Sequence, residues 1–125
     1  MGMITKLFRG VLRSKPSARE QALLRERIQR LLDKWQPKLG VQVHHWNLRD
    51  MKKYWGSTNP QTREITFDSK LSGVTAPYLE ITVVHELVHL LEPGHTPRFY
   101  ALMDKHVPNW RRLHEQYAGP MTVNS

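Results

Sequence analysis

Apolar side chains recur at helical spacing between residues 17 and 36. They fall three or four positions apart, so one face of an α-helix would gather them while the basic residues point away from it. The stripe consists of Leu24, Ile28, Leu31 and Trp35, widened by Leu23 and Leu32. Ser17 and Glu20 stand at the spacing of a capping box, which marks the start of the helix. We expect it to end near Gln36, since Pro37 disfavours helical geometry in the preceding residue.

The next part of the chain changes to short stretches that are typical of β-strands. Residues 41–46 alternate partly between apolar and polar, and residues 54–57 and 64–67 are rich in aromatic or β-branched side chains. Asn59-Pro60 favours a turn between the last two stretches. We therefore predict a small antiparallel sheet of three strands that pair in sequence order, as a meander.

A different pattern begins at Pro77. Residues 79–91 are apolar on nearly every side of a helix, which indicates a helix buried inside the protein. Thr96-Pro97 has the form of an N-cap followed by a first-turn proline, and it predicts a second helix that runs to about His106. A third helix is expected after Pro108. Helices that precede and follow a run of strands are typical of the α+β class.

The composition limits the classes of protein that fit. A length of 125 residues suits one domain, and no apolar run approaches the roughly 20 residues that a membrane span needs. Cysteine is absent, which excludes disulfide scaffolds, iron–sulfur clusters and thiol catalysis, and is typical of a cytoplasmic protein. We expect a basic N-terminal arm over residues 1–16, a folded domain over 17–119 and a tail over 120–125.

Positive charge is concentrated near the start of the sequence. The net charge is +8, and residues 1–40 contribute +7 of it through ten Lys or Arg against three Asp or Glu. Such a basic segment indicates either an anionic partner, such as nucleic acid, or a solvated helix face. If an anionic partner binds, Arg25, Arg27 and Arg30 are its expected contacts.

The predicted buried helix carries the sequence His85-Glu86-Leu87-Val88-His89. Two histidines four residues apart project from the same helix face and can bind one Zn²⁺. Glu86 lies about 100° round the helix from His85, so it is placed to take a proton from a metal-bound water rather than to bind the metal. An unpaired carboxylate in an apolar helix is costly, so the pattern favours a metal site over two histidines with ordinary hydrogen bonds.

A third histidine follows the helix directly. Pro93 discourages a further helical turn and Gly94 permits a sharp change of direction, so His95 can fold back towards the helix. Three neutral imidazoles and one open position complete a catalytic zinc site. A carboxylate ligand from Asp104 or Glu115 is needed only if His95 does not bind. The histidines without ligand spacing are His44, His45, His106 and His114.

From His85 to Phe99 the sequence H-E-L-V-H-L-L-E-P-G-H-T-P-R-F resembles the signature of the YgjP-like metallopeptidases. Trp55-Gly56-Ser57, the stretch 64–67 and the stretch 108–112 are also similar to that family. The resemblance implies a compact zincin-like fold, with a small sheet packed on the active-site helix and one zinc ion held by the three histidines of the motif. It also implies that Glu86 is the catalytic base. The WLM and SprT groups are relatives, and some of them cleave proteins crosslinked to DNA.

Metzincins share the spacing of the three histidines. Their mid-motif glycine is replaced here by Glu92, and no downstream methionine turn is evident, so the chain departs from the metzincin pattern.

Together these patterns predict a zinc-dependent metallopeptidase that hydrolyses peptide or protein substrates. Tyr100 and Arg98 are the expected donors to the developing oxyanion, because they follow the motif closely. An extended substrate is expected to pair with an edge strand formed by Ile65, Thr66 and Phe67. The alternatives are a DNA-associated protease of the WLM or SprT type, a non-peptidase metal-dependent hydrolase, and a zinc-binding module without catalysis.

Overall fold

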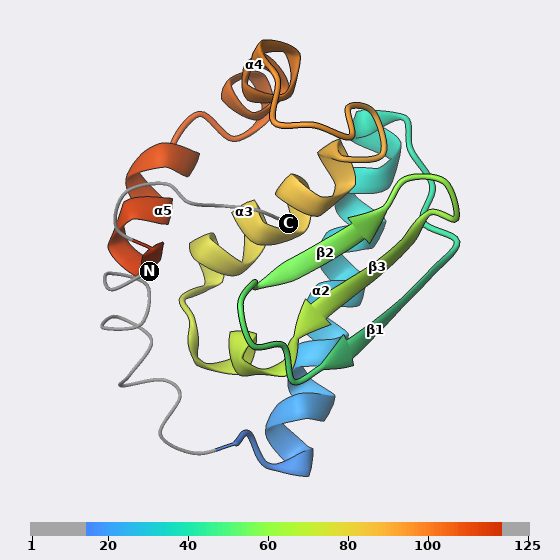
Figure 1. Cartoon of the computed structure of the whole chain (residues 1–125). Coiled ribbons are helices and arrows are strands. Elements are labelled where there is room, and N and C mark those ends of the chain that lie inside the picture. Colours follow the sequence, from blue (N-terminus) through green and yellow to red (C-terminus); the bar gives the residue numbers. More distant parts are fainter. Residues whose placement is uncertain (1–14, 119–125) are drawn as a thin grey trace.

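A computed structural model describes residues 15–118, and Figure 1 shows helices gathered around a small sheet. The predicted α+β class is confirmed. Residues 1–14 of the expected arm and the expected tail, 120–125, lie outside the described residues, and none of the described helices is both long and apolar enough to cross a membrane. The described elements are α2 (Ala18–Leu39), β1 (His45–Arg49), β2 (Gly56–Asn59), β3 (Glu64–Asp68), the 3₁₀ helix η1 (Ser69–Gly73), α3 (Ala76–Val88), α4 (Pro97–His106) and α5 (Trp110–Ala118).

The sheet is mixed, and the predicted antiparallel meander is wrong. The strand order is β1-β3-β2, in which β1 runs parallel to β3 and β2 runs antiparallel to it. Ile65 and Phe67 of β3 are 1% and 0% exposed, so the most apolar strand takes the centre and pairs on both sides. Alternation along a strand shows which side chains face the core, but it does not determine which strand becomes the neighbour.

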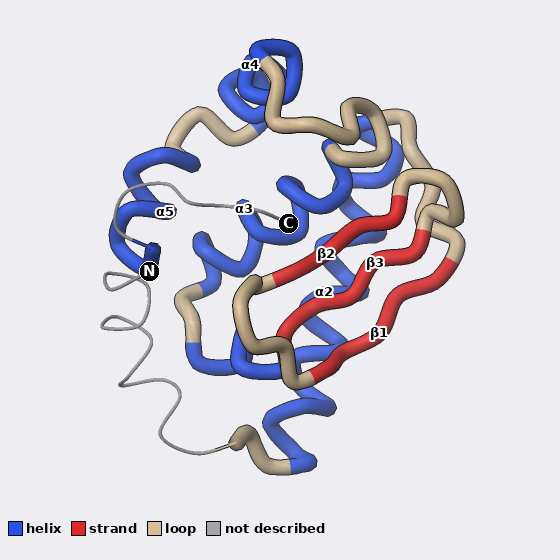
Figure 2. Tube along the Cα trace, in the orientation of Figure 1, coloured by secondary structure: helices blue, strands red, loops and turns tan. Residues whose placement is uncertain are grey.

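Helix α2 lies behind the sheet in Figure 2 and begins at the predicted capping box. The helix continues three residues beyond the predicted end at Gln36. Leu39 in the additional turn is buried, and the cap residue Gly40 adopts the left-handed conformation (φ 68°) that commonly ends a helix. Pro37 therefore costs one hydrogen bond near the end of the helix without stopping it.

Helix α3 forms the centre of the core. Ten of its thirteen residues are buried, as its all-round apolar pattern predicts. Its N-cap is Thr75, whose hydroxyl accepts from the N–H of Tyr78. Glu80 accepts from Lys34 Nζ at 2.7 Å and from Trp35 Nε1 at 2.8 Å, which joins α3 to α2. Helix α3 thus packs against both β2 of the sheet and α2, the longest described helix.

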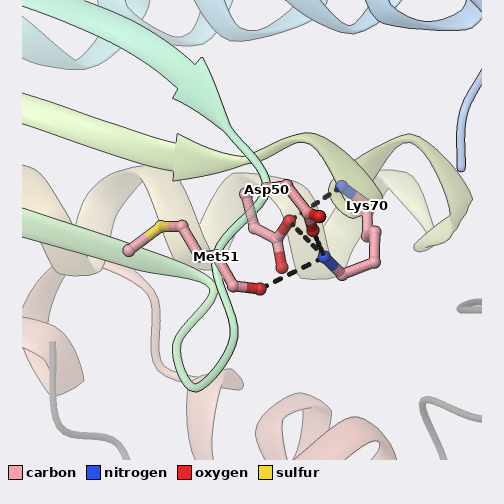
Figure 3. Close-up of polar contacts among 4 residues, drawn as sticks. Asp50, Met51 and Lys70 are labelled. Carbon is pink, nitrogen blue, oxygen red and sulfur yellow. Dashed lines mark hydrogen bonds and ion pairs between the residues drawn. The ribbon is translucent and has the colours of Figure 1, made fainter.

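A half-buried lysine contacts the segment between β1 and β2. The Lys70 ammonium contacts Asp50, the Met51 carbonyl at 3.1 Å and Asp68 Oδ1 at 3.1 Å, and we call this group the Lys70 clamp (Figure 3). Burial raises the pKa of Asp68, which is 0% exposed. Burial alone would lower the pKa of Lys70, but its bonds to the two carboxylates outweigh this and raise it. The clamp joins the residues that follow β1 to the end of β3.

Candidate metal centre

Three histidine side chains converge beside the C-terminal end of α3. His85 lies within the helix, His89 caps it, and His95 comes from the loop that follows. One ring nitrogen from each lies within 4.8 Å of the others, and the ring centroids are 4.8–5.4 Å apart. His85 and His89 are 6% and 2% exposed, so the group is largely shielded from solvent. The chain thus brings together the three histidines that the sequence motif singles out.

The loop that returns His95 is built by the last turn of the helix. The Leu90 N–H donates to Leu87 at 3.0 Å instead of continuing the α-helical pattern, and the Leu91 N–H donates to Val88 at 2.8 Å. The change of direction expected at Pro93 and Gly94 is confirmed, because both residues lie in a bend of the chain. Gly94 makes this bend without a positive φ, since among the described glycines only Gly40 has one. The tightened end of the helix and the bend at Pro93 and Gly94 together lead the chain back to His95.

Arg98 supports this loop from outside. Its guanidinium donates to the Leu91 carbonyl at 3.0 Å and to Glu92 Oε1 at 3.1 Å. Tyr100, the other expected oxyanion donor, stacks beside His95 with ring centroids 6.3 Å apart and against Trp110 at 5.7 Å. Tyr100 thus lies next to the histidines while Arg98 braces the chain, and an oxyanion role for either stays a prediction.

Phe99 packs against all three imidazoles at once. Its ring centroid lies 4.9 Å from that of His85, 4.6 Å from that of His89 and 5.0 Å from that of His95, and the side chain is 0% exposed. The sequence marks Phe99 only as the last residue of the family signature. Phe99 lies on the first turn of α4, after the N-cap Thr96, so α4 packs against the histidine group through this ring.

The charge state of the imidazoles suits a cation. Burial, and then the neighbouring imidazoles, lower the pKa of His85 well below its ordinary value, and burial lowers the pKa of His95. Both rings are therefore neutral at neutral pH. The backbone carbonyl of Glu92 lies 3.2 Å from His89 Nδ1 and can only accept, so Nδ1 carries a proton and the neutral form of this ring has its lone pair on Nε2.

The three ring nitrogens that lie within 4.8 Å of one another are suited to binding a metal ion. Nε2 of His85 and Nε2 of His95 are buried and have no hydrogen-bond partner among the described residues. Unpartnered buried nitrogens are costly, and a divalent cation supplies the missing partner. Three neutral imidazoles within reach of one point therefore form a site that can hold one metal ion.

Glu86 is not part of this group of possible ligands, and its carboxylate contacts β2 of the sheet. It is 1% exposed, and its Oε1 accepts a hydrogen bond from the Thr58 hydroxyl at 2.6 Å. On its other side, a Cβ atom placed on Gly56 would lie 2.9 Å from Oε2. The sequence analysis does not find the contact with Thr58. Gly56 and Thr58, two residues apart, share one face of β2, but alternation along a strand does not show which helix residue that face meets.

The remaining histidines lie outside this group. His44 and His45 are exposed, and His106 packs edge-on against Trp35 at 6.2 Å between ring centroids. His114 is buried and stacks on Tyr78, whose hydroxyl lies 3.4 Å from His114 Nδ1, and burial lowers its pKa to about 4.

The two expected carboxylate ligands are not part of the histidine group. Asp104 accepts from Trp110 Nε1 and from Arg111, and Glu115 is exposed. Neither belongs to the group of residues that can hold a metal ion.

Two other predicted surfaces have different outcomes. Ile65, Thr66 and Phe67 cannot form the substrate edge, because β3 is the central strand of the sheet and both of its sides are already paired. The outer strands of the described sheet are β1 and β2.

The expected anionic contacts lie on α2, where Arg25 and Arg30 are exposed and Arg27 is half-buried. Arg30 also pairs with Glu26 at 3.5 Å. Nucleic-acid binding has no support from this arrangement and stays a prediction.

Comparisons with known proteins agree with the geometry. The family model described as "YgjP-like, metallopeptidase domain" matches residues 13–118. Among solved structures, the crystal structure of the metallopeptidase zymogen of Pyrococcus abyssi abylysin is similar, with a TM-score of 0.67 and 20% sequence identity. The similarity covers 78% of this chain and 97% of that one, and at this identity it shows the fold alone. A search of curated proteins finds no significant match.

Proposed function

The chain belongs to the YgjP-like metallopeptidase family, and on this premise we propose that it is a zinc-dependent peptidase with Glu86 as its general base. The observation that carries the proposal is the convergence of three imidazoles, with ligand atoms within 4.8 Å, beside a carboxylate on the same helix. A purely structural zinc site needs no buried base next to its ligands. This is why a catalytic role is preferred to a binding module.

His85, His89 and His95 would hold one zinc ion through their ring nitrogens. Imidazole ligands favour zinc among the common divalent metals, and three protein ligands leave a coordination position open for a reactant. When bound, zinc supplies a Lewis acid and lowers the pKa of a coordinated water to about 7. The chain itself supplies the orientation, because Phe99 contacts each ligand ring and the Glu92 carbonyl orients His89.

Glu86 would move the proton. Its carboxylate accepts a proton from the attacking water as the water oxygen bonds to the peptide carbonyl carbon, and it then donates that proton to the amine nitrogen as the C–N bond breaks. The carboxylate is buried, and it is held by the Thr58 hydroxyl. Burial keeps competing bulk water away from this proton transfer.

Peptide substrates would bind along β2. This strand is an edge strand, and its inward face contacts Glu86 through Gly56 and Thr58. The unpaired backbone groups of an edge strand can bind an extended peptide with little sequence preference. The edge expected at Ile65, Thr66 and Phe67 is paired on both sides, and its neighbour β2 takes the proposed substrate role in its place.

The test compares the wild-type chain with Glu86→Gln and His95→Ala. Zinc content is measured after purification, and digestion of casein and a peptide library is followed with and without a chelator. We expect one zinc per chain and chelator-sensitive cleavage in the wild type. Glu86→Gln should keep its zinc and its fold but lose about 10²–10⁴-fold in kcat, while His95→Ala should lose zinc. Full zinc occupancy without cleavage would favour the binding module, and cleavage of non-peptide substrates alone would favour another hydrolase.

A further inference from the structure

A hydroxyl group from the sheet reaches the carboxylate of Glu86. Thr58 Oγ1 lies 2.6 Å from Glu86 Oε1, although the two residues are 28 positions apart in sequence. This separation is typical of a hydroxyl that donates to an ionised carboxylate, and such bonds are about twice as strong as bonds between neutral groups. The contact joins the edge strand β2 directly to the helix that carries the histidines.

The same hydroxyl also reaches the main chain of Glu86, whose carbonyl oxygen lies 3.0 Å away. In a continuous α-helix the Leu90 N–H would pair with that carbonyl, but here it donates to Leu87. The tightened end of α3 therefore leaves the Glu86 carbonyl without its helical donor, and the Thr58 hydroxyl, whose single hydrogen the carbonyl shares with the nearer carboxylate oxygen, lies within hydrogen-bond distance of it. One side chain thus contacts both the backbone and the carboxylate of a single residue, which fixes the side-chain rotamer.

Gly56 holds the opposite side of the carboxylate. A Cβ atom there would lie 2.9 Å from Glu86 Oε2, closer than real Cβ atoms come, and 3.0 Å from Cδ and Cγ, which is tighter than most real contacts. Gly56 and Thr58 point to the same face of β2, because side chains alternate along a strand. The strand therefore forms a seat for Glu86, with a space at residue 56 and a hydrogen-bond donor at residue 58.

We propose that Thr58 is a positioning residue for Glu86, and that Gly56 leaves the space in which the carboxylate is seated. This inference rests on the proposed function, in which Glu86 is the general base. Because β2 is also the proposed peptide-binding edge, the strand that aligns the substrate also aligns the base relative to it. Loss of the hydroxyl should therefore reduce the chemical step and leave peptide binding nearly unchanged.

The experiment uses the zinc-loaded full chain and three substitutions. Thr58→Val keeps the shape and removes the hydroxyl, Thr58→Ser keeps the hydroxyl, and Thr62→Val makes the same chemical change on the exposed turn between β2 and β3. A base displaced by about 1 Å costs about 100-fold, so we expect kcat to fall about 10–100-fold in Thr58→Val, with KM within about twofold. Thr58→Ser and Thr62→Val should stay within about threefold of the wild type.

A second measurement is independent of turnover. In crystals of the zinc-loaded proteins, Thr58→Val should leave the three histidines and the zinc occupancy unchanged but displace the Glu86 carboxylate. Wild-type kcat in Thr58→Val, an equal loss in Thr58→Ser, or an unmoved carboxylate would each overturn the role of Thr58 while the peptidase proposal stands. A wild-type chain that binds zinc but cleaves no peptide would overturn the proposed function and this inference together.

Discussion

The Lys70 clamp allows a sharp test of how burial changes the energy of an ion pair. In Lys70→Met, the carboxylate of Asp68 loses its cation while it remains buried, since its side chain is 1% exposed and that of Lys70 only 13%. Removing one partner of a buried ion pair typically costs about 3–5 kcal/mol. The residual exposure of Lys70 favours the lower end, so we expect a loss of about 3 kcal/mol. For a domain of this size that corresponds to a fall of about 10 °C in Tm.

Lys34→Met is the matched control. Lys34 pairs with Glu80 at 2.7 Å, but its side chain is 49% exposed, and exposed pairs contribute less than about 1 kcal/mol. Both variants are compared with the wild type by urea unfolding at pH 7 and by thermal scans. The double variant Asp68→Asn/Lys70→Met should recover part of the lost stability. Asparagine keeps an oxygen that accepts from the backbone N–H of residue 70, and it carries no charge. Equal losses in the two lysine variants would refute the argument from burial.

Three further predictions concern the site and its surroundings. Burial lowers the pKa of His114 from about 6.5 to about 4, so the contribution of this residue to the free energy of unfolding should be complete above pH 6.5 and should fall by about 3 kcal/mol as the pH falls to 4. In His114→Phe, unfolding measured across that range should show a smaller fall in the free energy of unfolding. An equal dependence on pH in the variant and the wild type would contradict this. Phe99→Leu should weaken zinc binding about tenfold in a chelator competition, since one ring supports all three ligands; unchanged affinity would show that the loop alone positions them. Substrate peptides N-methylated at alternate residues should show KM raised about tenfold, and those methylated at the interleaved residues should not, if an edge strand binds the backbone; equal KM values would argue against β2 as the binding edge.

Local chemistry made much of the fold predictable. The capping box at Ser17 forms as expected, with the Glu20 N–H donating to the Ser17 hydroxyl at 3.1 Å and the return bond at 2.7 Å. The histidines of α3 share a face because helical geometry requires it, and His95 joins them because Pro93 prevents a further turn. Each of these features depends on residues within a few positions of one another.

The features that escaped prediction depend on segments distant in the sequence. The order of the strands is determined by how the sheet packs, and alternation within a strand contains no information about it. Pro37 marks a plausible helix end, but the burial of Leu39 favours one more turn. The contact between Thr58 and Glu86 spans 28 residues and is a product of that strand order, so no local pattern could reveal it.

The strand order also has a consequence for biosynthesis. The strand at the centre of the sheet is the last of the three to leave the ribosome, and its two neighbours do not pair with each other. A nascent chain that ends before Glu64 therefore contains two strands without a partner and no sheet. Helix α3, which carries Glu86, follows all three strands in the sequence, so the contact between Thr58 and Glu86 and the proteolytic centre that we propose would form only after the whole sheet has been translated.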